Sequence, residues 1–332
     1  MNKKTIFILG SNSFSGSHYI NHLLDKKHNV VGISRSSELS EIFLPYKLNK
    51  NIGLFNFYKL DINKTQDLKK IFFLINKFKP KYIVNFMAQG MVEQSWKKPL
   101  DWYRTNFISH VNLINHLKEK NYLKKFVQFS TPEVYGSIEK KRKESINFNP
   151  STPYAVSRAA FDMHLKILHD NYKFPVVITR TANVYGPFQQ IYRIIPKTIF
   201  CAFNNQKINL DGGGKTTRSF IYIEDVTKVL YQIMIKGKSG STYHISTKSL
   251  ISIKNLVKKI IGKINNNLKI IKIVKERIGK DKSYNLSANK IINEFAFLPK
   301  INLNIGINKT IDWYLMYKKK IHNNNLNYKH KK

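Results

Sequence analysis

Short apolar runs rich in Val, Ile and Phe recur along the first 180 residues, and most are bounded by Gly, Pro or Asn. Such runs are typical of strands that are buried on both faces of a parallel sheet. They predict six strands, over Thr5–Leu9, 30–33, Phe55–Lys59, 82–86, 125–129 and 176–179. Between the strands, apolar residues recur at helical spacing, as at Phe161, Leu165 and Leu168. This alternation predicts right-handed crossovers and an α/β fold with a doubly wound parallel sheet of the Rossmann type.

The strand–helix rhythm changes after Pro187. A loop-like segment around Gly212-Gly213-Gly214 is followed by an apolar run over 220–223 and a helical pattern over 225–235. We therefore predict a dinucleotide-binding domain over 1–180 and a smaller, partly interleaved C-terminal substrate domain over 181–317. Elements near 220–246 are expected to return to the main sheet.

The formal net charge of +37 favours contact with anions. The lysines are nevertheless scattered through every segment, and no nucleic-acid recognition motif accompanies them, so no specific nucleic-acid partner is expected. Only the tail, 318–332, is basic and apolar-poor enough to predict a disordered arm.

The single cysteine, Cys201, cannot form an internal disulfide, which favours a reducing compartment. The apolar run Thr5–Leu9 is too short for a signal peptide, and no apolar segment approaches membrane-spanning length. These features predict a cytoplasmic protein without membrane association.

The first predicted strand runs directly into a turn of small residues, Gly10-Ser11-Asn12-Ser13-Phe14-Ser15-Gly16, and then into a helix. This is the layout of a dinucleotide-binding turn, in which a helix N-terminus faces the cofactor pyrophosphate. The pattern is Gly-x-x-Gly-x-x-Gly with Ser13 at the middle glycine, and an ordinary glycine-rich turn is the alternative. We expect Gly10, Ser13, Phe14 and Gly16 to contact the cofactor.

The second predicted strand ends without the acidic residue that commonly binds the ribose hydroxyls of NAD. Arg35, between Ser34 and Ser36, suits a 2′-phosphate instead, so NADP is favoured and NAD is the alternative. A solvated surface arginine is the competing interpretation. Asp61 and Ile62 follow the third strand and are expected at the adenine, although Asp61 would also suit a helix N-cap.

Candidate catalytic residues follow the fifth predicted strand. It ends in Ser130-Thr131-Pro132-Glu133, and a helix then opens with Tyr154-Ala155-Val156-Ser157-Arg158. Tyr154 and Arg158 are four residues apart and share a helix face, where a fixed cation stabilises a phenolate and lowers its pKa. Thr131 is placed to bind the same substrate hydroxyl, at the strand ends where ligands bind. The three residues suit removal of a hydroxyl proton while hydride leaves for a nicotinamide.

With these motifs the chain resembles the extended short-chain dehydrogenase/reductases, in particular the NAD(P)-dependent sugar-nucleotide epimerase/dehydratase family. The segments 181–187, 218–226 and 279–284 carry the resemblance through most of the length. It implies a nucleotide-diphosphate sugar as substrate and a cofactor contact at Ala88. It also implies a homodimer formed by helices over 101–118 and 154–171, although their apolar patterns would equally suit an internal core. By the same match Asn183 and Arg218 are expected at the diphosphate, with Lys282 a weaker candidate. Asn106 would position substrate or water, or only cap a helix.

Two departures from the family pattern matter. Arg158 replaces the lysine of Tyr-x-x-x-Lys, and Pro132 replaces an acidic or hydroxyl residue that the dehydratases carry between Thr and Glu. In the family's 4,6-dehydratases, C4 of the sugar is oxidised, a glutamate removes the C5 proton, water leaves from C6, and hydride returns to C6. Glu133 stands at the position of this base, which favours a nucleotide-sugar 4,6-dehydratase, a lyase. A solvated or ion-paired loop carboxylate is the competing interpretation of Glu133.

Two other functions stay open. A 4-epimerase or reductase of the same family needs no base at Glu133. A non-catalytic dinucleotide-sensing protein would use the same fold for binding alone.

Overall fold

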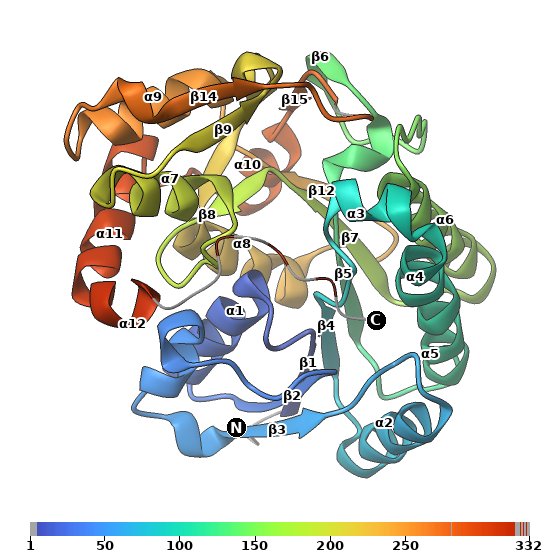
Figure 1. Cartoon of the computed structure of the whole chain (residues 1–332). Helices are drawn as coiled ribbons and strands as arrows, with labels where there is room; N and C mark the ends of the chain where they lie inside the picture. The colour runs from blue at the N-terminus through green and yellow to red at the C-terminus, as the bar shows by residue number, and fades with distance from the viewer. Residues whose placement is uncertain (1–4, 280, 323–325, 327, 329, 331–332) are drawn as a thin grey trace.

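A seven-stranded parallel sheet forms the centre of the protein. The computed structural model describes residues 5–279, 281–322, 326, 328 and 330 (Figure 1). The strands lie in the order β12-β7-β5-β4-β1-β2-β3. Their bounds are β1 Thr5–Leu9, β2 Asn29–Ser34, β3 Phe55–Lys59, β4 Tyr82–Asn85, β5 Lys125–Ser130, β7 Val176–Thr181 and β12 Thr242–Ile245. The doubly wound prediction is confirmed, and the six predicted strands are present with ends shifted by at most two residues. The strand order reverses between β1 and β4, where the carboxyl ends of parallel strands form a ligand crevice.

Helices cover both faces of this sheet (Figure 1). Alternate residues of β1 point to opposite sides, because successive side chains of a strand do so. Phe7 and Leu9 pack in one core cluster, and Ile6 and Ile8 pack in another. The first cluster contains residues of α2 (Thr65–Phe78), α5 (Ser109–Leu117) and α6 (Pro153–Tyr172). The second contains residues of α1 (Phe14–Asp25) and α8 (Ile223–Lys236).

The late elements α8 and β12 belong to this layered unit. Strand β12 pairs in parallel with β7, and Thr242 lies opposite Ile178. The chain therefore leaves the sheet after β7 and returns to it some sixty residues later, as roughly expected for 220–246. The division into domains over 1–180 and 181–317 stays a prediction.

A second group of elements packs around its own apolar cluster, which contains residues of α7 (Ile194–Phe203), α9 (Ile253–Gly262), α11 (Leu303–Met316) and α12 (Lys318–His322). Four two-stranded sheets join it: β8 (Asn183–Tyr185) with β11 (Phe220–Tyr222), β9 (Ile208–Asp211) with β14 (Ile271–Val274), β10 (Thr217–Arg218) with β13 (Ile251–Ser252), and β6 (Ile138–Arg142) with β15 (Tyr284–Leu286). The pairing of β6 with β15 joins an early segment to a late one. The remaining helices are α3 (Val92–Lys97), α4 (Pro99–Tyr103) and α10 (Asn289–Phe295).

The helix expected over 101–118 is interrupted. A π-helical turn, Arg104–Ile108, separates α4 from α5. Such turns insert an extra residue into the helical repeat and are frequent at functional sites. Here the turn contains Asn106, whose side chain is fully buried.

The prediction of a disordered tail from residue 318 is wrong for 318–322. These residues form α12, and Ile321 is buried in the cluster around α7 and α11. Two further tail residues also have defined contacts: the Tyr328 ring lies edge-on to Tyr192, and the His330 ring stacks on Trp102. The apolar and aromatic side chains among the lysines provide the anchors that net charge alone does not reveal. The rest of the tail lies outside the described residues.

Within the described ranges, no helix combines the length and the apolar character needed to cross a bilayer.

Candidate active site

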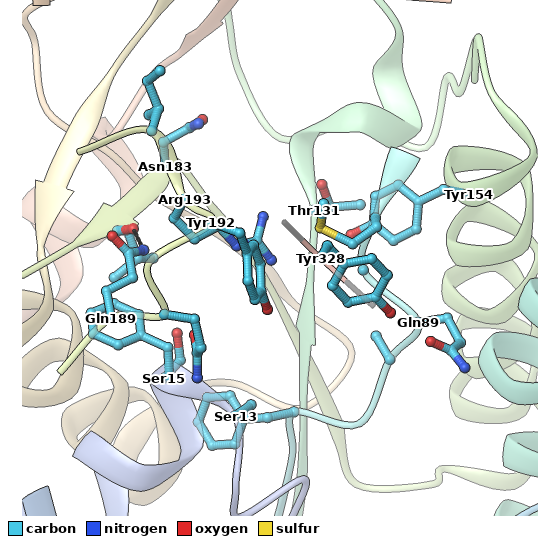
Figure 2. Close-up of a pocket in the computed structure, with 18 of the residues that line it drawn as sticks. Ser13, Ser15, Gln89, Thr131, Tyr154, Asn183, Gln189, Tyr192, Arg193 and Tyr328 are labelled. Atoms are coloured by element: carbon cyan, nitrogen blue, oxygen red, sulfur yellow. Dashed lines mark hydrogen bonds between the residues drawn. The ribbon is translucent and has the colours of Figure 1, made fainter. Parts of the chain in front are cut away.

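A cleft of about 980 Å³ opens at the carboxyl ends of the central strands. Most of the side chains predicted as site residues line it, together with others from the second group of elements (Figure 2). The predicted residues in the lining are Gly10, Ser13, Phe14, Arg35, Asp61, Ile62, Ala88, Thr131, Glu133, Tyr154, Arg158, Asn183 and Arg218. Gly16, Asn106 and Lys282 are not among the lining residues.

The turn between β1 and α1 is held tight by its glycines and by Ser13. Gly10 has a φ of +80°, and a Cβ there would lie 2.7 Å from the backbone nitrogen of Met87. A Cβ on Gly16 would lie 2.4 Å from the Gly10 carbonyl oxygen, so Gly16 supports the turn from behind. The Ser13 hydroxyl donates to that carbonyl at 2.7 Å and accepts from the Gly16 N–H. The first N–H groups of α1, at Phe14 and Ser15, thus face the cleft without intrahelical partners and suit an anion.

Arg35 follows β2 and lines the same end of the cleft. Its Nη1 atom is buried and has no hydrogen-bond partner among the described residues. A buried donor without a partner is costly, so a guanidinium in this state is suited to an anionic ligand. The Ser34 hydroxyl is not available in the same way, because it already accepts from Ser11 Oγ and from the Asn12 N–H.

Asp61, Ile62 and Ala88 complete this half of the lining. Asp61 is not the N-cap of α2, which is Lys64. Its carboxylate instead accepts from the Asn63 N–H at 2.9 Å, and this contact fixes the loop after β3. Ile62 is buried, and Ala88 is exposed to the cleft.

Thr131, Glu133 and Tyr154 meet where β5 ends and α6 begins. Tyr154 lies in the first turn of α6, whose N-cap is Thr152, and Thr131 caps the 3-10 turn Pro132–Tyr135 (η5). Tyr154 lies close enough to Thr131 for the threonine hydroxyl to lower the pKa of the phenol. The phenol and the threonine hydroxyl therefore face one position in the cleft (Figure 2).

The pKa of Tyr154 contradicts one expectation. Burial and the Glu133 carboxylate raise it, whereas Arg158 and the Thr131 hydrogen bond lower it, and the net pKa lies above the ordinary tyrosine value. Arg158 does lower the pKa of Tyr154, as predicted, but the prediction of a net lowering is wrong, because the other groups around the phenol raise its pKa by more. Desolvation of the phenolate outweighs one neighbouring cation.

Arg158 is almost fully buried, and its guanidinium binds backbone. Nη2 donates to the Phe129 carbonyl oxygen and Nη1 to that of Met87. Both carbonyls belong to the segments that end β5 and follow β4. Arg158 therefore holds two strand ends together, and only its Nε, buried without a partner among the described residues, is uncommitted. A lysine carries its donors on a single nitrogen, so it lacks the two separated nitrogens with which Arg158 reaches both carbonyls.

Glu133 is an acidic side chain in the lining of the cleft, two residues after Thr131. Burial raises its pKa to about 7, although Arg218, Arg193 and Arg277 lower it. A carboxyl group with such a pKa exchanges protons near neutrality, as a general acid or base must. This favours a functional role over the solvated loop carboxylate that the sequence left open.

Arg218 and Asn183 lie on the far side of the cleft from the glycine turn. The Arg218 guanidinium stacks on the Tyr284 ring at 4.1 Å, and Nη1 and Nη2 donate to the carbonyl oxygens of Thr217 and Asp281 at 2.8 Å. These contacts hold the charge rigidly at the cleft wall. Asn183, at the start of β8, is exposed to the cleft.

The expected substrate contacts at Asn106 and Lys282 are wrong. Asn106 accepts from the Gln89 N–H and donates to the Gln89 carbonyl and to Ser157, so its polar atoms are used inside the protein. It fixes the segment after β4 against α6. The Lys282 side chain is exposed outside the cleft, and only its backbone is engaged, with Ser137 and Thr217.

The sequence did not single out several lining residues. Arg193 and Tyr192 precede α7, Arg277 follows β14 and bonds to Asp211, and Tyr328 lies in the tail. No local pattern in the sequence marks Arg193 or Arg277 as a residue of the cleft. They reach the cleft only because late segments fold back over β1 and β4.

Comparison with known proteins agrees with this geometry. Residues 7–320 match the family described as GDP-mannose 4,6 dehydratase. The human dTDP-D-glucose 4,6-dehydratase is 31% identical, and the match covers 94% of this chain and 90% of the human protein. The dTDP-glucose 4,6-dehydratase of Haemophilus influenzae is 27% identical, with 93% of this chain and 97% of that protein covered.

Solved structures show the same likeness. The dTDP-glucose 4,6-dehydratase of Bacillus anthracis, in complex with NAD, superposes with a TM-score of 0.83 at 27% identity, over 95% of this chain and 98% of that one. The dTDP-glucose 4,6-dehydratase of Streptomyces venezuelae gives a TM-score of 0.86 at 24% identity, which supports the fold. The chain therefore belongs to the GDP-mannose 4,6-dehydratase family, within the sugar-nucleotide epimerase/dehydratase group of extended short-chain dehydrogenase/reductases.

Proposed function

We propose that this protein is a nucleotide-sugar 4,6-dehydratase. The observation that carries the proposal is Glu133, a carboxyl group with a pKa of about 7 in the same cleft wall as Thr131 and Tyr154. A base beside the C4 oxidation centre is required to remove a C5 proton. It is not required for epimerisation at C4.

The cleft is suited to a dinucleotide. The glycine turn brings backbone N–H groups to the cleft without Cβ atoms in the way. At the same end Arg35 presents a nitrogen to which no described residue is hydrogen-bonded. A bound nicotinamide would accept hydride from C4 of the sugar and return it to C6. The side chains of the protein supply the remaining steps.

Tyr154 takes the proton from the C4 hydroxyl, with Thr131 hydrogen-bonded to the same oxygen. The charge on Arg158 favours the phenolate that this step needs. Near neutral pH Glu133 is partly protonated, which weakens its opposing effect on the Tyr154 pKa.

Glu133 then takes the C5 proton, which the adjacent C4 ketone has made acidic. Pro132 has no proton to give to the leaving C6 hydroxyl. We infer that Glu133 itself returns the proton to that hydroxyl, so that water leaves from C6. The C5=C6 bond so formed would be reduced at C6 by the hydride held on the bound nicotinamide and protonated at C5 by solvent. The Tyr154 proton is released to solvent, so that the net change is the loss of one water. One carboxyl group with a pKa near 7 is suited to both directions of transfer.

The substrate we propose is a nucleotide-diphosphate sugar. Arg218 and Arg193 supply cations for the diphosphate. Asn183, at the start of β8 and opposite Phe220 of β11, lines the same cleft. For the cofactor, Arg35 favours NADP, whereas the Bacillus anthracis relative was solved with NAD. NAD remains the alternative for this chain.

A panel of nucleotide sugars tests the function. Incubation with catalytic amounts of NADP or NAD is expected to give a 4-keto product lighter by one water, without net consumption of cofactor. Tyr154→Phe is expected to abolish turnover. A 4-epimerase would instead give a product of unchanged mass and tolerate Glu133→Gln. A dinucleotide-sensing protein would bind cofactor, turn over none of the sugars, and be indifferent to Tyr154→Phe.

A further inference from the structure

A buried ion pair lies directly behind the catalytic residues. Arg180, on β7, stands in register between Ser130 on β5 and His244 on β12. It pairs with Asp162 of α6 at 3.0 Å, and both side chains are at most 2% exposed. The proposed reaction uses neither residue.

Asp162 connects this pair to the start of the catalytic segment. It lies eight residues after Tyr154 and four after Arg158, on the same helix. Its Oδ2 accepts from Ser130 Oγ at 2.9 Å as well as from Nε and Nη2 of Arg180. Ser130 immediately precedes Thr131, so the backbone that presents Thr131 is tied to the helix that carries Tyr154.

Arg180 connects the pair to the end of the same segment. Its Nη1 donates to the Tyr135 hydroxyl and to the Ser145 carbonyl oxygen. The Tyr135 hydroxyl also contacts His244 Nε2 at 2.9 Å, and the Arg180 guanidinium lies 4.7 Å from the Tyr135 ring centroid. Tyr135 is 1% exposed and closes the 3-10 turn that carries Glu133.

We propose that the Asp162–Arg180 pair is a positioning pair for catalysis, which clamps both ends of residues 131–135 and so sets Thr131 and Glu133 against Tyr154. The inference rests on the proposed dehydratase function, in which these three groups act on adjacent atoms of one sugar. Neither residue of the pair lines the cleft, and they act through Ser130 and Tyr135.

Stability alone is a weak explanation for such a pair. The desolvation of two buried charges offsets most of the free energy of their attraction. An apolar pair of similar volume often stabilises a fold equally well. The hydrogen bonds of the guanidinium do fix a geometry, because its planar fork holds each N–H in a defined direction. Displacing a catalytic group by about 1 Å can cost about a hundredfold in rate.

Tyr135→Phe is the main test, because it removes one hydroxyl and leaves the ion pair in place. Tyr243→Phe is the matched control: Tyr243 is also buried, on β12, and its hydroxyl bonds to Glu294 and to the Lys238 N–H outside the cleft. For Tyr135→Phe we expect kcat to fall about 10- to 100-fold with KM changed less than about threefold. The control is expected to keep both constants.

The pH profile separates positioning from lost stability. In the wild-type protein Glu133 should give the rate an acidic limb near pH 7. If the clamp fails, Glu133 reaches solvent and its pKa falls toward the ordinary value, so the limb moves to lower pH in Tyr135→Phe. A fall in folded fraction alone would reduce the rate without moving the limb, and that result would overturn the proposal.

Hydrogen exchange gives a readout that does not depend on turnover. The amide of Gly136 donates to the Glu133 carbonyl and that of Asn149 to the Val134 carbonyl. Both are expected to exchange faster in Tyr135→Phe and in the milder Ser130→Ala, but not in Tyr243→Phe. Unchanged exchange, or faster exchange with unchanged kcat, contradicts the clamp. If the wild-type protein dehydrates none of the sugars, the proposed function fails, and the exchange data still decide whether the pair holds the segment.

Discussion

At the scale of single residues, Glu133 has the most direct consequence for measurement. The base must be ionised to take the C5 proton, and burial raises its pKa to about 7. The dehydration rate should therefore fall as the pH drops below about 7 and level off above it, up to the pH at which other groups intervene. A rate profile measured from pH 5 to 9 on one nucleotide sugar checks this, and a limb near pH 4.5 would contradict it.

Glu133→Gln separates the two halves of the reaction. Loss of a general base typically costs about 10²- to 10⁴-fold, so dehydration should fall by that much. Oxidation at C4 needs Tyr154 rather than Glu133, so a single turnover should still produce reduced cofactor, visible by its absorbance. No reduced cofactor would mean that the carboxylate also serves the first step.

We propose that Arg35 sets the choice between NADP and NAD. A charged hydrogen bond to a 2′-phosphate is worth about 1.5–3 kcal/mol, so Arg35→Ala should weaken NADP binding by about tenfold or more. NAD binding should change little. Titration calorimetry with both dinucleotides measures the difference, and an equal loss for both would show that Arg35 does not bind a 2′-phosphate.

The residues of the site were predictable where chemistry and local spacing coincide. Thr131, Tyr154 and Arg158 belong to segments whose order along the chain is itself a signal, and the structure brings them to one cleft wall. Asn106 was misassigned because its partners, Gln89 and Ser157, are distant in sequence. The contribution of Arg193 and Arg277 depends on how late segments fold back, which no local pattern encodes.

At the scale of elements, the turn between β1 and α1 is the most constrained. Gly16→Ala would set a Cβ against the Gly10 carbonyl, a backbone atom that cannot move aside. We expect cofactor affinity to fall at least tenfold, with stability lowered by about 1–3 kcal/mol, as for other overpacked sites. Gly53→Ala is the matched control, because nothing lies within 4 Å of a Cβ there. Equal behaviour of the two variants in dinucleotide binding and thermal unfolding would count against this view of the turn.

Elements with strong periodicity were predictable, and those shaped by tertiary contacts were not. The six buried strands carry continuous Val, Ile and Phe runs, which leave little choice of structure. The π-helical turn at Arg104–Ile108, which contains the buried Asn106, left no mark in the apolar spacing of the chain. Helix α12 could not be predicted from its lysine-rich sequence, because Ile321 is its one buried residue and gives no apolar periodicity.

At the scale of the whole molecule, one face of α6 carries exposed apolar side chains that no other described segment covers. Val156, Met163 and Ile167 recur at helical spacing and are exposed, Met163 by 56%. With Ile108 of the neighbouring π-helical turn, they form an apolar stripe that suits the proposed homodimer.

Met163→Glu tests the dimer. Light scattering should give twice the chain mass for the wild-type protein and a single chain mass for the variant. Phe73→Glu serves as control, because Phe73 is also exposed, by 65%, but lies on α2. A monomeric wild-type protein at micromolar concentration, or dissociation by both variants, would contradict the assignment of this face.

The return of β12 to the sheet limits how the molecule can be divided. The six residues of β7 are all buried in the intact protein. A chain cut after residue 180 would lose β12, one of the two strands that pair with β7, and would leave that edge of β7 open. It would also lose α8, which covers one face of the sheet. An open, apolar strand edge recruits other strands, so such a fragment should precipitate or form fibres rather than bind dinucleotide. A minimal cofactor-binding unit would have to keep 223–245 and splice it directly behind β7.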